Sequence, residues 1–123
     1  MQLTKERAVT LHRRMWRWIG LKTLKEKRCV EKYDWFDKFG LEIICVECYC
    51  CEYVTQFSAL HCDANMPRCR FCPIDWGGTT CLHSAQGVFG RWNCARIKGN
   101  WQEAGKLALQ IAELPERNDY IVR

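Results

Sequence analysis

Ten cysteines are the residues of this 123-residue chain whose type and spacing most clearly indicate chemistry. Two residues separate Cys48 from Cys51 and Cys69 from Cys72, and 17 residues lie between these two pairs. This spacing lets both thiolates of a pair reach one ion, and two pairs complete a tetrahedron of four sulfur ligands. The sequence therefore predicts one metal ion bound by Cys48, Cys51, Cys69 and Cys72.

Two properties of this site stay open in the sequence. Two residues also separate Cys45 from Cys48, so that Cys45 can replace Cys51 as a ligand. Zinc is the ion we expect, because four-thiolate sites inside cells are mostly structural zinc sites. A rubredoxin-like iron centre uses the same four ligands, and the spacing does not distinguish the two metals.

The remaining cysteines show no further pairing at metal-ligand spacing, so we expect a single ion. Cys29 and Cys94 stand alone, and isolated cysteines are among the most buried residues, so both are expected in the core. The roles of Cys50, Cys62 and Cys81 stay open. His12 is expected on a side of the first helix, in packing or solvent, without a catalytic role.

Helices at both ends of the chain must position the cysteine region, because residues 45–92 show little hydrophobic periodicity. A first helix is predicted after Thr4, with Val9 and Trp16 as a second, narrower apolar edge. Its main apolar stripe consists of Ala8, Leu11, Met15, Trp18 and Ile19. Gly20 is expected to weaken or bend this helix.

Two further helices are predicted from the sequence. A short aromatic helix is expected over residues 33–39, ended by Gly40. In the last third, an amphipathic stripe predicts a helix over Trp101–Leu114, with Asn100 and Glu103 at its start and Pro115 at its end.

These elements indicate a mainly α-helical, small single domain over residues 1–123. We expect a basic helical part (1–40), a zinc-binding module (41–95) and a C-terminal helix with a tail (96–123). The N- and C-terminal helices are expected to pack around the irregular module. The zinc would replace the hydrophobic core that a long aperiodic segment does not build.

The charge of the chain is uneven. The formal net charge is +5, and residues 1–28 carry nine basic and two acidic groups, a balance of +7, which leaves −2 for the rest. Such a basic segment suits an acidic protein surface or nucleic acid. Arg13, Arg14 and Arg17 are the candidate partner-binding residues, on the helix side away from the main apolar stripe.

Several functional classes are not expected. No apolar run is long enough to cross a membrane and no secretory signal segment is evident, so we expect a soluble cytoplasmic protein. Pro67 and Cys69–Cys72 are similar to part of the zinc deaminase pattern, but Arg68 interrupts it. A four-thiolate ion also has no open position for water. We therefore expect no enzyme.

Several short sequence words together resemble a group of small cysteine-rich, zinc-binding proteins of phages and prophages of Gram-positive bacteria. They lie in residues 11–19, 48–53, 69–76, 81–82 and 111–117, and thus span most of the chain. The resemblance favours Cys51 over Cys45 as a ligand, because C-x-x-C-E-Y and C-x-x-C-P-[IL]-D-W are the words that recur.

The resemblance also implies a function. Small accessory proteins of phages include many inhibitors of host defence, among them type II anti-CRISPR proteins, and some of these bind metal. We therefore expect a non-enzymatic inhibitor that binds a host defence protein, with the type II CRISPR effector nuclease Cas9 as the favoured partner. The alternative is a zinc-stapled nucleic-acid-binding module in phage gene regulation.

Overall fold

The computed structural model describes residues 4–39, 49–50, 73–76 and 87–116 of the chain. In these residues it forms four α-helices: α1 (Lys5–Glu26), α2 (Lys32–Phe39), α4 (Val88–Lys98) and α5 (Trp101–Ala112). The prediction of a mainly helical protein is thereby confirmed. None of these helices is long and apolar enough to cross a membrane.

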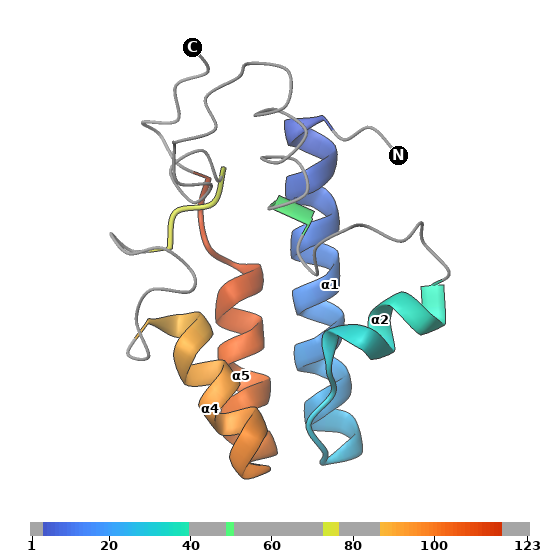
Figure 1. Ribbon diagram of the computed structural model, residues 1–123, viewed down its shortest axis with the longest axis vertical. Coiled ribbons are helices and arrows are strands. Elements are labelled where there is room, and N and C mark those ends of the chain that lie inside the picture. Colours follow the sequence, from blue (N-terminus) through green and yellow to red (C-terminus); the bar gives the residue numbers. More distant parts are fainter. Residues whose placement is uncertain (1–3, 40–48, 51–72, 77–86, 117–123) are drawn as a thin grey trace, which may run out of the picture.

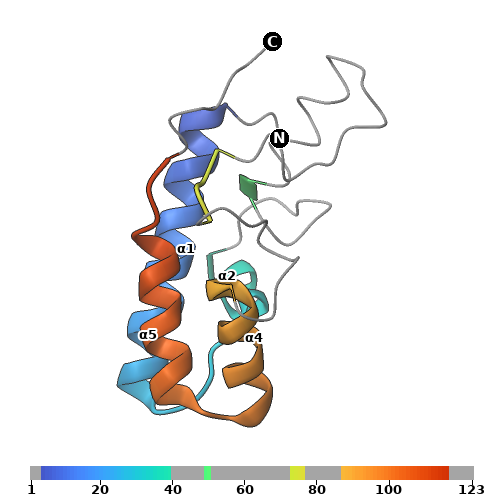
Figure 2. The same cartoon turned by 90° about the vertical axis from the view of Figure 1, so that its left-hand side faces the viewer.

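The described helices form two layers. Helices α1 and α5 lie side by side and run in opposite directions, and α5 also packs against α4 (Figure 1). Seen from the side, α2 and α4 lie together on one face of the α1–α5 pair (Figure 2). The buried hydrophobic residues of all four helices belong to one core.

Helix α1 begins at the predicted cap. The hydroxyl oxygen of Thr4 accepts a hydrogen bond from the amide of Arg7 at 3.1 Å. The balance of its two apolar edges differs from the prediction, because Trp16 is 1% exposed whereas Trp18 is only half-buried. Trp16 is central because α4 covers the second edge of α1: its indole ring lies 4.7 Å from that of Trp92, in an edge-to-face contact.

Gly20 does not end α1, which continues through Glu26. A Cβ atom added at Gly20 would lie 2.7 Å from Cγ of Leu109 and 3.0 Å from the carbonyl oxygen of Gly105. A Cβ added at Gly105 would lie 2.6 Å from side-chain atoms of Leu24. The two glycines therefore allow the backbones of α1 and α5 to approach closely where they cross. This close approach explains why α1 contains Gly20, a residue that we expected to weaken the helix.

Replacing Gly20 by Ala is expected to destabilise the protein by about 1 kcal/mol. The added methyl overpacks the crossing at a cost of about 1–3 kcal/mol, which exceeds the gain of about 1 kcal/mol in helix propensity. Urea unfolding of Gly20→Ala measures the difference. The Leu109→Ala background removes the side chain that the methyl meets, and there the cost should shrink. A Gly20→Ala variant more stable than the wild type would contradict a close crossing.

Helix α5 confirms the predicted start and ends two residues before the predicted end. The side-chain oxygen of Asn100 accepts from the amide of Glu103 at 3.3 Å, which caps the first turn. The helix ends at Ala112, and Leu114 and Pro115 continue in a non-helical conformation. The prediction extended the helix because Leu114 continues the apolar stripe.

Helix α4 is absent from the sequence prediction. Only Trp92 and Ala95 are buried in it, so that its hydrophobic period is weak. Its end carries a clear signal, since Gly99 adopts a left-handed conformation (φ 73°) and its amide bonds the carbonyls of Ala95 and Arg96. Gly99 follows the basic residues Arg96 and Lys98 of the last turn, and this pattern in the sequence could have located the end of α4.

Candidate functional site

The predicted metal ligands all lie outside the described residues; they are Cys48, Cys51, Cys69 and Cys72, with Cys45 as the alternative. Cys62, Cys81 and the helix cap at Gly40 also lie there. No group of three or more His, Cys, Asp or Glu side chains is arranged for a metal within the ranges that the structure describes. The segments next to both cysteine pairs are described, and they show how each pair is connected to the helical core.

The first of these segments lies inside the Cys48–Cys51 motif. Tyr49 and Cys50 are both fully buried. The hydroxyl oxygen of Tyr49 accepts a hydrogen bond from Nε1 of Trp35 in α2 at 2.9 Å, and its ring lies 5.7 Å from that of Phe36. Burial raises the pKa of the Tyr49 hydroxyl above its ordinary value. The chain between the first two predicted ligands is thus anchored to α2.

The second segment, residues 73–76, directly follows Cys72. Ile74 is 1% exposed and forms an antiparallel β-bridge with Glu116. The amide of Asp75 donates to the carbonyl of Pro115 at 2.9 Å. Trp76 packs edge-to-face against Phe89 of α4, at 6.3 Å between ring centroids. Residues 73–76, which follow the second cysteine pair, are therefore held between the segment after α5 and the core.

His12 lies in this same part of the core. It is fully buried, and its ring contacts Trp76 edge-to-face at 5.7 Å. Among the residues that the structure describes, neither of its ring nitrogens has a hydrogen-bond partner, and Nε1 of Trp76 is likewise buried and unpartnered. The prediction left His12 in packing or solvent. Its spacing from Val9 and Trp16 on the second apolar edge of α1 was the sequence signal for its burial.

The three candidate partner-binding arginines have different surroundings. Arg13 is half-buried, and its Nη2 donates to the carbonyl of Leu114 at 3.2 Å. Arg17 is exposed and pairs with Glu113 at 3.2 Å. Arg14 is exposed, and no hydrogen bond ties it to the rest of the described chain. Arg13 therefore joins α1 to the end of α5, whereas Arg14 and Arg17 are available at the surface.

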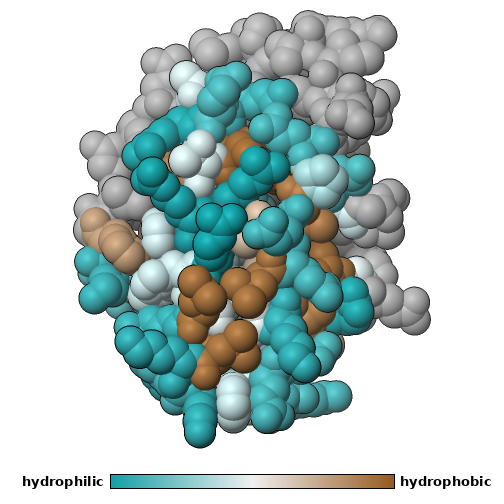
Figure 3. Space-filling view, turned by 180° about the vertical axis from the view of Figure 1, so that it is seen from behind, coloured by the Kyte–Doolittle hydropathy of each residue, from teal (hydrophilic) through white to brown (hydrophobic). Residues whose placement is uncertain are grey.

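An exposed apolar group lies beside these arginines. Leu21 is 56% exposed, and Arg17 and Lys25 stand one helical turn to either side of it. Leu109 of α5, half-buried, lies at the nearby Gly20 crossing. Figure 3 shows apolar side chains gathered on this side of the molecule among hydrophilic ones. We call the surface formed by Arg14, Arg17, Leu21, Lys25 and Leu109 the α1–α5 face.

The lone cysteines differ from each other. Cys29 is half-buried against the core, and burial raises the pKa of its thiol. Cys94 is exposed, so the expectation that it lies in the core is wrong. The reason is its place on α4, where Trp92 and Ala95 face the core and Cys94 lies on the outer side.

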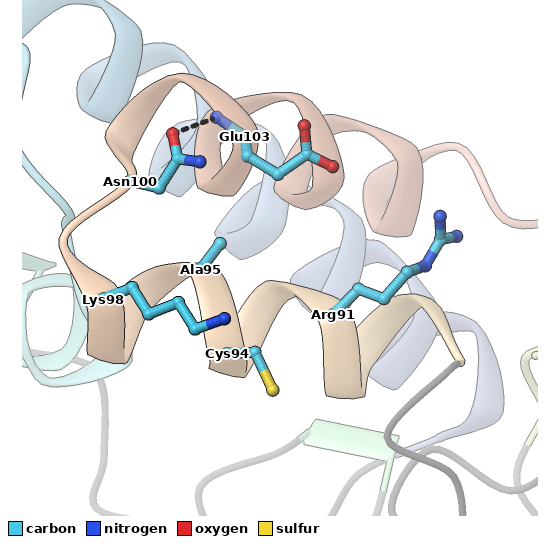
Figure 4. A pocket seen from close by; sticks show the side chains of 6 residues that line it. All are labelled: Arg91, Cys94, Ala95, Lys98, Asn100 and Glu103. Carbon is cyan, nitrogen blue, oxygen red and sulfur yellow. Dashed lines mark hydrogen bonds between the residues drawn. The ribbon is translucent and has the colours of Figure 1, made fainter.

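A shallow hollow of about 240 Å³ lies beside Cys94, between α4 and α5. Its lining consists of Arg91, Cys94, Ala95, Lys98, Asn100 and Glu103. In Figure 4 the sulfur of Cys94 points away from Asn100 and Glu103. The side chains of this hollow thus do not converge on one point.

Comparison with protein families, with curated proteins and with solved structures gives no match to this chain. The family and the function are therefore proposals, which rest on the sequence words described above and on the geometry of the described residues.

Proposed function

We propose that this protein is a non-enzymatic, zinc-binding phage protein that inhibits a host defence system by binding one of its proteins. The proposed target is Cas9, the effector nuclease of type II CRISPR systems. The α1–α5 face is the observation that carries the protein-binding part of this proposal, and the resemblance to phage proteins supports the choice of host defence as its context.

The α1–α5 face has the composition of a protein-binding surface. Protein interfaces combine an apolar centre with a polar rim, and arginine is enriched in them. Leu21 supplies an exposed apolar side chain on a regular helix. Arg17 and Lys25 lie one turn to either side of it, and Arg14 lies two turns before it on the same side of the helix. A partner with a small apolar hollow and acidic groups around it would be complementary to this face.

The alternative, a nucleic-acid-binding module, is favoured by the same cations. Of the three candidate arginines, only Arg14 and Arg17 are available at the surface for a phosphate contact. Arg13 bonds the carbonyl of Leu114, and Arg17 pairs with Glu113, whose carboxylate would also repel phosphate. The side chain of Leu21 has no charge and no hydrogen-bond donor with which to bind a phosphate group. These contacts favour a protein partner over nucleic acid.

Zinc has a structural role in this proposal. Cys48, Cys51, Cys69 and Cys72 would hold it as thiolates, and the ion would supply folding free energy to the segment between the helices. The described flanks fit this role, because residues 49–50 and 73–76 enter one core from two predicted ligand pairs. An ion between the pairs would fix the cysteine region against α1 and α2.

Substitutions on the α1–α5 face test the proposed interface. Leu21→Asp is expected to lower the recovery of a protein partner at least about tenfold, because it places a charge at the apolar centre. Arg14→Ala with Arg17→Ala should weaken binding less, and Arg13 is left intact because it stabilises the fold. The measurement is a tagged pull-down from a bacterial lysate that contains a type II CRISPR system, with and without nuclease treatment.

Ile97→Asp is the matched control, since Ile97 is 69% exposed on α4, in the other layer. It should leave partner recovery and melting temperature unchanged. Equal recovery with Leu21→Asp and Ile97→Asp would remove the α1–α5 face from the interface. Recovery of nucleic acid alone, lost after nuclease treatment, would support the alternative function.

A further inference from the structure

Leucines from two helices lie together where α1 and α5 cross. Leu24 of α1 and Leu109 of α5 are half-buried, and each lies against a glycine of the opposite helix. Leu21 precedes Leu24 by one helical turn and is 56% exposed. We call Leu21, Leu24 and Leu109 the leucine patch; it is the apolar centre of the α1–α5 face, on the side of the molecule that Figure 3 shows.

The residues around this patch follow the spacing of a helix seam. On α1, intervals of three, four and three residues separate Arg14, Arg17, Leu21 and Leu24. On α5, intervals of four and three residues separate Gln102, Lys106 and Leu109. Alternation of three and four residues is typical of surfaces that pack on another helix, where each side chain enters a hole between four residues of that helix. Such a hole is the small apolar hollow that Leu21 requires.

Two lysines stand at the edges of the leucine patch. Lys25 directly follows Leu24 in α1, and Lys106 directly follows Gly105, the residue of α5 against which Leu24 lies. Both lysines are exposed, and among the described residues neither forms an ion pair. One cation from each helix is therefore available beside the apolar centre, and each can pair with a carboxylate of a bound segment.

The charge of this surface also indicates which occupant suits it. Arg14, Arg17, Lys25 and Lys106 make the surface basic, and Glu113 pairs with Arg17 at its end. A symmetric pair of chains would bring two such basic surfaces together, and like charges at an interface are costly. An acidic segment is stabilised by the same cations. The charges therefore favour an acidic segment of another protein over a second copy of this chain.

We propose that the α1–α5 face binds an acidic amphipathic helix of the partner protein. The inference rests on the proposed function and adds the shape and the charge of the segment that is bound. Apolar side chains of this helix enclose Leu21, and its carboxylates pair with Lys25 and Lys106. Helices that bind in this way carry their apolar anchors at positions i, i+3, i+4 and i+7.

Two synthetic helical peptides test the proposal when each is titrated into the full-length protein and followed by amide NMR. Both peptides carry leucines at positions i, i+3, i+4 and i+7. One carries glutamates beside these leucines, and the other carries lysines at the same positions. The glutamate peptide should bind at least about tenfold more tightly, because the lysine peptide places like charges opposite each other. The shift changes should concentrate on α1 and α5.

Charge reversal separates the proposed contacts from the overall charge of the protein. Lys25→Glu with Lys106→Glu should reverse the preference, so that the lysine peptide binds more tightly. Arg91→Glu with Lys98→Glu changes the net charge equally at exposed positions of α4, in the other layer, and should keep the wild-type preference. Leu21→Ser should weaken binding of the glutamate peptide about tenfold, because it removes the apolar centre.

Several results would overturn the inference. Equal affinity for the two peptides, or binding of neither, would show that the face does not select an acidic helix. A reversed preference in the α4 variant would show that overall charge decides. A wild-type dimer that Leu21→Ser dissociates would place a second copy on the face.

These outcomes differ from a failure of the proposed function. A protein partner that the pull-down recovers, and that Leu21→Asp loses, would keep the proposed interface even where the glutamate peptide does not bind. Selective binding of the glutamate peptide, reversed in Lys25→Glu with Lys106→Glu, would support the inference even where the lysate yields no protein partner.

Discussion

Removal of the metal is expected to unfold the segment between α2 and α4 and to release Trp76 from the core. Structural zinc contributes about 10–16 kcal/mol of apparent binding free energy in small zinc-binding peptides, and at the proposed site this would become folding free energy. The segment from residue 73 to residue 76 contacts both α1 and the chain after α5. Loss of the ion should therefore reduce the stability of the helices as well. Chelator titration followed by circular dichroism and tryptophan fluorescence measures both effects.

Single cysteine substitutions make this prediction specific. Cys69→Ser and Cys72→Ser should lower the melting temperature far more than Cys29→Ser, because only the first two remove predicted ligands. Cys29 is a suitable control, since it packs half-buried against the core. Equal melting temperatures for the three variants and the wild type would show that no metal clamp stabilises the fold.

Replacement of Trp16 by Ala is expected to destabilise the protein by about 3–5 kcal/mol, the usual cost of a large aromatic truncation in a core. Trp16 is 1% exposed. Its ring contacts Trp92 and Phe89, at 4.7 and 6.0 Å, and the ammonium group of Lys32 lies 5.6 Å from it. The substitution removes these aromatic contacts between α1 and α4 and a large side chain from the core. Urea unfolding with linear extrapolation gives the difference in free energy.

Trp18→Ala provides the comparison, because Trp18 is half-buried and packs on Trp35 and Phe39 at the edge of the core. Its cost should be clearly smaller than that of Trp16→Ala. The hydrophobic pattern of the sequence predicts the opposite, a larger loss of stability for Trp18→Ala, since Trp18 belongs to the main apolar stripe and Trp16 to the narrower edge. A larger loss for Trp18→Ala would mean that α4 does not cover the second edge of α1.

The terminal helices were predictable because local signals agree there. The Thr4 and Asn100 caps, and the aromatic residues of α2, lie where the spacing places them. Contacts that depend on partners distant in sequence were not predictable. From the sequence alone, Gly20 is expected to weaken α1, and only the structure shows that it lies opposite Gly105 at the helix crossing. Likewise, Trp16 is placed by the sequence on the narrower apolar edge of α1, and only the structure shows that α4 covers this edge.

The candidate site shows the same division. The cysteine spacing predicts a ligand set, and the structure describes only its flanks. Nothing in the local sequence indicates that His12 and Trp76, 64 residues apart, share one buried contact. Arg13, Arg14 and Arg17 are equivalent in a charge count, and only the carbonyl of Leu114 and the carboxylate of Glu113 distinguish them.

The proposed function is tested most directly by titrating the purified, zinc-loaded protein into DNA cleavage by a purified Cas9–guide RNA complex. We expect cleavage to stop near an equimolar ratio, and a complex of the two proteins to persist as salt is raised, because an apolar centre is less salt-sensitive than phosphate contacts. Leu21→Asp should restore cleavage, and Ile97→Asp should not. Full cleavage in the presence of excess protein, with no complex on size exclusion, would contradict the proposed function.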